Sequence, residues 1–479
     1  MRARIFAEKN KKWWTLGAVA FGLFMIMLDN TIVNVALPSI QRDLGIDVSE
    51  LEWVVNGYAL TFAVLMLTGG KLADLFGRRL VFILGLAIFT GSSLACGLAE
   101  SADVLIGARV VQGVGAALMN PATLSIITAT FPPRQRGMAL GIWVGVSAVA
   151  LAIGPLVGGV IAEHIDWGWI FFINVPVGIM AIVVARLVIR ESRDTSAKQR
   201  LDLPGLLTSG VALFALTYGL IEANTYGWTS ARILSLFAVA AVGLALFVVL
   251  ESRQRVPMLD LSLFRNRTFA GANAVMMLVA LAMFGVFFFF VSLYMQNVLG
   301  YSPTEAGATF LPMTMLIILI APLAGRFSDR VGSRWLMGAG MSLVALSLLL
   351  FSRLDVTSGF WDLLPGLLIG GAGMAMVMTP TTAAAMGSVP VDKAGIGSAV
   401  LNSMRQVGGS LGIAIMGAIV LSYADVAPGD PRAPQQFVDG FQASLLVAAA
   451  IAFAGAVVAV ATVREYHHAD AAPLAEAAA

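Results

Sequence analysis

Long apolar runs alternate with short polar segments along the whole chain. Each run is long enough for a membrane-spanning helix, which needs about 20 mostly apolar residues. A count of twelve or thirteen spans remains an alternative to the fourteen given below, because the long Gly- and Pro-containing runs can hide a break. The pattern predicts an all-α polytopic membrane protein with fourteen transmembrane helices, each end uncertain by a few residues. The runs are 13–37, 50–70, 80–99, 103–130, 137–162, 169–189, 204–221, 231–250, 268–296, 306–324, 335–352, 361–387, 394–422 and 439–463.

The positions of the basic residues test this count. With the N-terminus placed in the cytoplasm, 24 of the 30 Lys and Arg fall in inner segments and 4 in outer ones. Cytoplasmic segments of membrane proteins carry such an excess. The two others, Arg109 and Arg405, lie inside predicted spans. We therefore expect a multi-pass protein of the cytoplasmic (inner) membrane with both termini in the cytoplasm. The first run has no small-residue cleavage site after it, so we interpret it as a retained helix.

Composition supports the membrane assignment. The chain is 58% hydrophobic and only 12% charged, whereas soluble domains carry about 25% charged residues. The net charge of +2 gives no reason to expect nucleic acid binding. Cys96 is the only cysteine, and the three histidines lie in a predicted outer loop and in the tail, so we expect neither a disulfide nor a metal site. The chain has no phosphate-binding loop and no catalytic constellation, so we expect no cofactor and no enzyme activity.

A short motif occurs twice. The segment GKLADLFGRR at 70–79 returns 255 residues later as GRFSDRVGSR at 325–334. Both copies follow the second helix of a set of six, which indicates two similar halves, a known transporter architecture. We predict a six-helix bundle at 13–190, a linker with two inserted helices at 191–267, a second six-helix bundle at 268–464 and a disordered cytoplasmic tail at 465–479. The two bundles are expected to be pseudo-symmetric.

The repeated motif is suited to a tight turn between helices. Its glycines allow the turn and close backbone approach, and its aspartate can cap a helix or pair with an arginine. We interpret the motif mainly as an element that stabilises one conformation, in a structural or gating role. Its predicted gating residues are Gly70, Asp74, Gly77, Arg78, Gly325, Asp329 and Gly332.

Five further motifs occur in a fixed order along the chain. They are LDNTIVNVALP (28–38), LIGARVVQGVGAA (105–117), Gly145 with GPLVGG (154–159), WGWIFFINVP (167–176) and SAVLNSMRQVGG (398–409). Together they resemble the major facilitator superfamily, and more narrowly its fourteen-helix drug:proton antiporters. The resemblance covers nearly the whole chain. Gly168 stands where the family usually has an arginine, which puts an outer-face contact of that arginine in doubt.

The resemblance implies a proton-coupled antiporter that exports amphipathic or cationic drugs and toxic small molecules by alternating access. Its expected partners are a small-molecule substrate, protons and the lipid bilayer, and we expect it to work as a monomer. Some relatives carry acids in helices ten and thirteen. This chain has none there, so coupling schemes that need them are not transferred. The antiporter motif of the fifth helix is Gly145, Gly154, Pro155, Gly158 and Gly159, whose proline bends the helix and whose glycines allow tight contact.

Charges inside a membrane are energetically unfavourable and so indicate function. Asp29 is the only acid in the interior of a predicted span, and Arg109 lies at a similar depth in the same half. Burial raises the pKa of an aspartate and a nearby arginine lowers it, so the pair is suited to exchanging a proton for a cation. A static salt bridge is the alternative. We assign proton coupling to Asp29, Arg109 and Glu222, although Glu222 lies at a helix end and can be simply solvated.

Several polar side chains are predicted to line a substrate cavity. Arg405 lies about 18 Å along its helix from the cytoplasmic edge, at ~1.5 Å per residue. A structural hydrogen-bond network and contact with substrate are equally supported as roles for its side chain there. The predicted cavity residues are Asn34, Gln112, Asn120, Asn402, Arg405 and Gln406. Most Met and Phe side chains are expected to face lipid or the core.

Two other functions compete with drug export. One is proton-coupled import of a small nutrient or metabolite, against which the fifth-helix motif argues. The other is an intramembrane enzyme or receptor, against which the two-fold repeat and the missing catalytic set argue.

Overall fold

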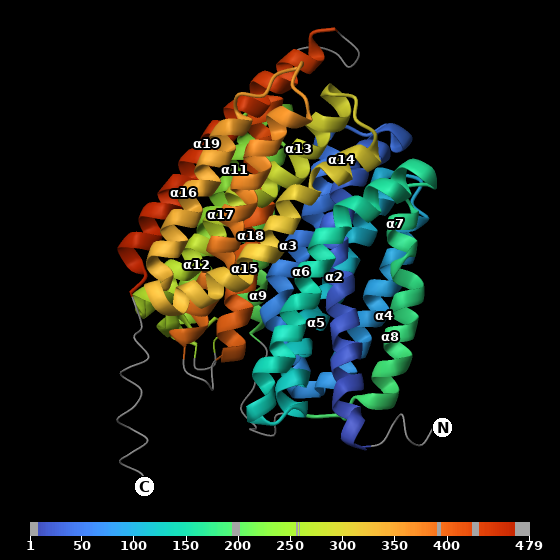
Figure 1. The fold of residues 1–479 in the computed structure, drawn as a ribbon, viewed down its shortest axis with the longest axis vertical. Helices are drawn as coiled ribbons and strands as arrows, with labels where there is room; N and C mark the ends of the chain where they lie inside the picture. The colour runs from blue at the N-terminus through green and yellow to red at the C-terminus, as the bar shows by residue number, and fades with distance from the viewer. Residues whose placement is uncertain are drawn as a thin grey trace.

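The computed structural model describes residues 8–193, 202–254, 257, 259–389, 394–423 and 431–464. In these ranges the chain forms a bundle of long helices without strands (Figure 1). The predicted tail at 465–479 lies outside the described residues. Among the described residues up to 193 the helices are α2 (Glu8–Leu44), α3 (Val48–Phe76), α4 (Arg78–Gly97), α5 (Ala102–Thr130), α6 (Pro133–His164), α7 (Trp169–Phe172) and α8 (Asn174–Val188).

The remaining elements continue the bundle. Three helices follow in the middle of the chain: α9 (Leu203–Ile221), α10 (Ala223–Tyr226) and α11 (Ala231–Arg253). The last part contains the 3-10 helix η1 (Leu261–Arg265), α12 (Arg267–Val279), the π-helix η2 (Ala280–Phe290), α13 (Val291–Leu293), the π-helix η3 (Tyr294–Val298), α14 (Pro303–Thr309), α15 (Leu311–Val331), α16 (Ser333–Phe351), α17 (Phe360–Gly387), α18 (Ala394–Leu421) and α19 (Ala433–Thr462).

Twelve helices in the described part of the chain are long and apolar enough to cross a membrane. The helical, membrane-spanning fold is therefore confirmed. The predicted number of fourteen is compatible with it, since α6 and the continuous helical segment from α12 to η3 match the two other predicted runs. A multi-pass membrane protein follows, because only helices or closed barrels satisfy their backbone hydrogen bonds inside lipid.

Some predicted spans differ from the helices observed. The first was expected to end before Pro38, but α2 continues to Leu44 with Pro38 inside it. Proline ends a helix less strictly in a membrane protein, because neighbouring helices satisfy the freed backbone groups. The predicted span at 268–296 is also not a uniform α-helix, since η2 and η3 are π-helical. Such wider turns often occur at functional sites.

The two copies of the repeated motif build the same turn. Gly77 joins α3 to α4 with φ +119°, and Gly332 joins α15 to α16 with φ +90°. A glycine is favoured at both places because residues with a Cβ rarely adopt positive φ. The motif therefore produces two equivalent helix–turn–helix corners, as its sequence suggested.

The helices form two groups with α9 between them. In Figure 1 the blue-to-green helices α2 to α8 lie on one side and the yellow-to-red helices on the other. Helix α9 contacts both α3 and α18. We call the end where α2 begins and α19 ends the terminal end, at the bottom of Figure 1, and the opposite end the distal end. The domain boundaries at 190 and 268 stay a prediction.

Contacts between the two groups lie from the middle of the bundle to its distal end. The Gln296 Nε2 atom donates to the Val35 carbonyl at 2.9 Å, and the Thr304 N–H donates to the Glu163 carboxylate at 2.9 Å. Nearer the middle, the Ser403 hydroxyl donates to the Ala63 carbonyl at 3.4 Å. These contacts join η3, α14 and α18 to α2, α6 and α3, and they hold the distal end together.

Candidate functional site

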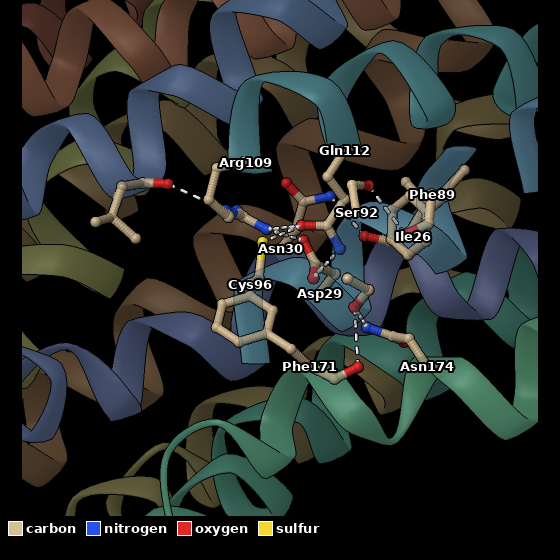
Figure 2. A network of polar contacts seen from close by, with 12 residues as sticks. Ile26, Asp29, Asn30, Phe89, Ser92, Cys96, Arg109, Gln112, Phe171 and Asn174 are labelled. Atoms are coloured by element: carbon tan, nitrogen blue, oxygen red, sulfur yellow. Dashed lines mark hydrogen bonds and ion pairs between the residues drawn. The ribbon is translucent and has the colours of Figure 1, made fainter. Parts of the chain in front are cut away.

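A buried ion pair joins α2 to α5. The Arg109 Nη1 atom lies 2.5 Å from the Asp29 Oδ2 atom, and the two side chains are 1% and 0% exposed (Figure 2). Sequence reasoning placed both residues at similar depth, and the structure brings them together. A proton-coupling role for the pair stays a prediction.

Further bonds hold this pair on all sides. The Gln112 amide nitrogen donates to Asp29 Oδ1 at 3.0 Å, and the Gln112 carbonyl accepts from Arg109 Nη1 at 2.8 Å. The Arg109 Nε atom donates to the Val54 carbonyl of α3 at 3.0 Å. The Arg109 guanidinium also lies 4.3 Å from the centre of the Tyr58 ring, a favourable cation–π arrangement. Both carboxylate oxygens of Asp29 are therefore engaged.

The spacing of α5 explains how one helix supplies both partners of Asp29. Arg109 and Gln112 are three residues apart, so they lie on the same helix face. Around them α5 packs tightly against its neighbours, since a Cβ at Gly113 would meet the Tyr58 carbonyl of α3 at 2.6 Å. The network is thus built into a closely packed bundle, and burial strengthens each of its polar bonds.

Helix α18 carries three of the predicted cavity residues, and Asn402, Arg405 and Gln406 are all half-buried. The Asn402 amide donates to the Ser398 carbonyl at 3.0 Å. Arg405 forms no hydrogen bond or ion pair with any residue that the structure describes, although it lies near enough to Tyr58 for an electrostatic interaction. An arginine side chain with five donors is therefore available at mid-helix.

The three other predicted cavity residues lie in the first half, and two of them have side-chain hydrogen bonds there. Gln112 is part of the ion-pair network, and the Asn34 amide donates to the Asn30 carbonyl at 2.8 Å. Asn120 is buried, and its own carbonyl accepts from the Thr123 hydroxyl at 2.6 Å. Among the predicted cavity residues on α18, Arg405 and Gln406 have no side-chain hydrogen bond to a residue that the structure describes, and Arg405 is the one that carries a charge.

Glu222 lies apart from the ion pair. It follows the last residue of α9 at the distal end, and the groups that interact with it are Asp47, Arg232, Glu50 and Trp53. Burial raises the pKa of Glu222, and the negative charge of Asp47 raises it further. The predicted proton-coupling set therefore contains residues from two separate places, the ion pair between α2 and α5 and the distal end of α9.

Sequence reasoning missed Glu52, an acid buried inside the bundle. Glu52 in the first turns of α3 has no exposed surface. The expectation that Asp29 is the only acid inside a span is therefore wrong, because α3 is buried from its beginning and not only from its apolar middle. Asn56, four residues later on the same face, was the available signal, since it marks a second polar position in an apolar run.

The antiporter motif of α6 lies where three helices meet. A Cβ at Gly158 would approach the Ile32 carbonyl of α2 at 2.6 Å, and Gly154 lies close to Thr31. On the α14 side, Gly159 lies against Pro303, and Gly307 lies against the Pro155 carbonyl. These glycines permit close helix contact, as in other membrane proteins. Gly145 does not, since a Cβ there would meet nothing within 4 Å.

The repeated motif forms an ion pair in its first copy. Arg78 and Asp74 lie 2.9 Å apart. The Glu191 carboxylate accepts from the backbone N–H groups of Arg79 and Leu80 at 3.1 Å each, so it caps the start of α4. Glu191 was not among the predicted residues.

The remaining gating glycines pack more loosely. A Cβ at Gly70 would lie 3.4 Å from Pro121, and one at Gly325 would lie 3.4 Å from Thr379. The side chain of Asp329 lies outside the described part. Among the described residues, no group of three His, Cys, Asp or Glu side chains could hold a metal ion.

Comparison with known proteins gives consistent results. The family model described as "Major Facilitator Superfamily" matches residues 19–413 and 274–478. The tetracenomycin C resistance and export protein of Streptomyces glaucescens is 39% identical over 421 residues, which are 88% of this chain and 78% of that protein. The puromycin resistance protein of Streptomyces alboniger is 35% identical over 448 residues, 92% of this chain and 88% of that protein.

Solved structures share the fold at low identity. A bacterial homolog of the human lysosomal transporter Spinster, in an inward-facing and unoccupied conformation, aligns with a TM-score of 0.68 at 18% identity. The alignment covers 95% of this chain and 98% of that chain. At this identity the likeness concerns the fold alone.

Proposed function

Since this chain belongs to the major facilitator superfamily, we propose that it is a proton-coupled antiporter that exports amphipathic or cationic drugs and toxic small molecules. The relatives that match most of the chain are named for resistance to antibiotics or for their export. The observation that carries the coupling proposal is the fully buried Asp29 carboxylate, held between Arg109 and Gln112 inside the bundle.

Proton exchange at Asp29 requires the ion pair to open. If Asp29 takes a proton, it loses its attraction to Arg109, whose guanidinium keeps the Val54 carbonyl, Gln112 and the Tyr58 ring. A buried carboxylate without its cation is unfavourable, so protonation and release of Arg109 favour each other. We propose that this linkage connects the proton to a rearrangement of α2 against α5.

Alternating access needs a movable boundary between the two helix groups. We place it where α6 meets α14, since Gly159 and Gly307 there allow the two backbones to slide at short distance. The predicted bundles at 13–190 and 268–464 are the bodies that would rock against each other, with one chain forming the complete monomeric transporter.

The buried side chains favour the amphipathic compounds within the proposed range of substrates. Asp29 is compensated by Arg109, whereas Arg405 has no counter-ion among the residues described. Amphipathic compounds with a neutral or acidic polar group therefore fit α18 better than purely cationic ones. We propose Arg405 as the residue that contacts this group.

Transport in ATP-free vesicles tests the function. We expect inverted vesicles with an imposed proton gradient to accumulate tetracenomycin C or puromycin, and to stop when the pH gradient and the potential are dissipated. Vesicles without the protein serve as the control for passive entry. Undiminished accumulation without either gradient would contradict proton coupling, and gradient-driven uptake into right-side-out vesicles only would favour the importer.

We also propose that the protein resides in the inner membrane with both termini in the cytoplasm, as the basic residues favour. The terminal end of the bundle would then face the cytoplasm and the distal end the outside. Reporter fusions at positions 5 and 470 should both report the cytoplasm. A split result would mean an odd number of spans.

A further inference from the structure

Glu52 occupies an unusual place in the fold. It lies on α3 near the distal end, where α3 and α18 meet, and its side chain has no exposed surface. Neither carboxylate oxygen has a hydrogen-bond partner among the described residues. The carboxyl group lies against Gly417 of α18, and a Cβ at Gly417 would overlap it. The absence of a side chain at Gly417 therefore makes room for this acid between the two helix groups.

The same face of α3 follows α18 along its length. Asn56 lies one turn after Glu52, and its amide nitrogen and oxygen likewise have no partner among the residues described. Further along, the Ala63 carbonyl accepts from Ser403 of α18. Glu52 therefore belongs to the contact between α3 and α18, which we call the seam.

Helices α9 and α10 cover the seam from outside. The Trp53 ring of α3 packs on the Phe214 and Tyr218 rings of α9, with centres 5.7 and 5.8 Å apart. The Asn224 amide of α10 donates to the Ala418 carbonyl of α18 at 2.6 Å, next to Gly417. This cover keeps water from Glu52 as long as α3 and α18 stay together.

The charged groups that act on Glu52 do not compensate it. They are Asp47, at the start of α3, and Glu222, at the end of α9, and both are acids. From α18 the seam presents Gly417, which has no side chain. Arg109 of α5 is bonded to Asp29. An ionised Glu52 would thus be buried without a cation or a donor from the described part of the chain, which is strongly unfavourable.

We propose that Glu52 is a proton-binding residue of the seam, neutral when α3 and α18 are packed together and ionised when they separate. On separation the carboxyl O–H bond breaks and the proton passes to water at the distal end. Closing the seam reverses this, so closure takes up one proton from the side that the distal end faces. The inference rests on the alternating access proposed above, in which external protons would favour return to the form closed to the outside.

Distance measurements across the distal end test this without any drug. Glu100 and Val356 are exposed in distal loops of the two helix groups, so spin labels on Glu100→Cys and Val356→Cys report its opening, while Cys96 is buried. The full chain is measured in lipid nanodiscs over a range of pH. For one linked proton, the ratio of open to closed molecules should rise by up to about tenfold per pH unit.

Neutral variants should remove one proton from this dependence. Glu52→Gln keeps the shape but cannot ionise, so it should stay closed at high pH, and Glu52→Ala, the second neutral variant, should also lose the slope. Glu52→Asp should keep it. Glu50→Gln is the matched control, because Glu50 lies two residues earlier and glutamine also completes its capping box. Neutral variants with the pH slope of the unchanged chain would overturn the proposal, even if drug export is confirmed.

Discussion

Asp29 and Glu52 are both acids without exposed surface, yet their surroundings differ. Asp29 lies within one group of helices, and both of its oxygens accept hydrogen bonds from Arg109 or Gln112. Glu52 lies between the two groups and has no such partner among the described residues. The bonds of Asp29 survive a rigid movement of the halves, whereas the burial of Glu52 depends on their relative position.

This difference gives the two acids different conditions for proton exchange. A paired acid inside one bundle can exchange its proton only if that bundle rearranges. An unpaired acid at a seam responds directly to opening, because separation of α3 and α18 gives it water. Three variants that change one site and leave the other intact test this comparison, and a fourth at an exposed ion pair gives the reference. They follow in order of expected effect on stability, from the largest to the smallest.

Arg109→Gln should have the largest effect on stability. It leaves Asp29 buried without its cation, and breaking a buried pair costs about 3–5 kcal/mol in the free energy of unfolding. Thermal unfolding in detergent measures the loss. The double variant Asp29→Asn with Arg109→Gln is the control, and it should recover much of the stability. A double variant as unstable as the single one would mean that the ion pair is not the cause.

Asp29→Asn should have a smaller effect on stability and a large one on transport. The change leaves Arg109 buried without its anion, and removing one partner of a buried pair costs about 3–5 kcal/mol. Because asparagine still accepts a hydrogen bond from Arg109, we expect a loss near the lower end of this range. Gradient-driven export should fall to background because asparagine cannot ionise. Flux and thermal stability are measured together. A well-folded Asp29→Asn chain with normal flux would contradict the proton-site assignment and leave Glu52 and Glu222 as candidates.

Gly417→Ala tests the seam itself. The new methyl group would overlap the Glu52 carboxyl, and overpacking of this kind costs about 1–3 kcal/mol. The cost falls on the closed seam, so spin labels at the distal end should report more open molecules. Gly145→Ala is the matched control, since open space surrounds it and alanine favours a helix. Equal behaviour of the two variants would show that the seam is not tightly closed at Gly417.

Asp74→Asn should have the smallest effect on stability. Its ion pair with Arg78 is partly exposed, since the Asp74 side chain is 29% exposed and the Arg78 side chain 21%. Such pairs contribute about 0–1 kcal/mol to the free energy of unfolding. We expect an unchanged unfolding temperature within about 2 °C, the shift for roughly 0.5 kcal/mol in a large domain. Arg78→Gln should behave alike. A loss as large as that of Arg109→Gln would erase the distinction between exposed and buried pairs.

The apolar pattern predicted the spans well because a helix in lipid must be apolar over its whole length. It was least accurate at the ends of helices and where the helix type changes. Helix α2 continues beyond Pro38 through a polar turn that reaches past the apolar run, and the segment after Val279 winds into a π-helix whose cause is not visible in its composition. The pairing of Asp29 with Arg109 was also predictable, because a charge inside a bundle needs a partner.

Sequence alone therefore determined the membrane fold, the repeated corner at Gly77 and Gly332 and the buried ion pair, since each follows from local pattern or from the high energy of a buried charge. Only the tertiary structure decided the environment of Glu52. A residue near the end of an apolar run can lie in water or in the core, and its neighbours on α18 and α9 are more than 150 residues away along the chain. Whether that acid is hydrated, paired or isolated depends on how distant helices pack, which no local pattern contains.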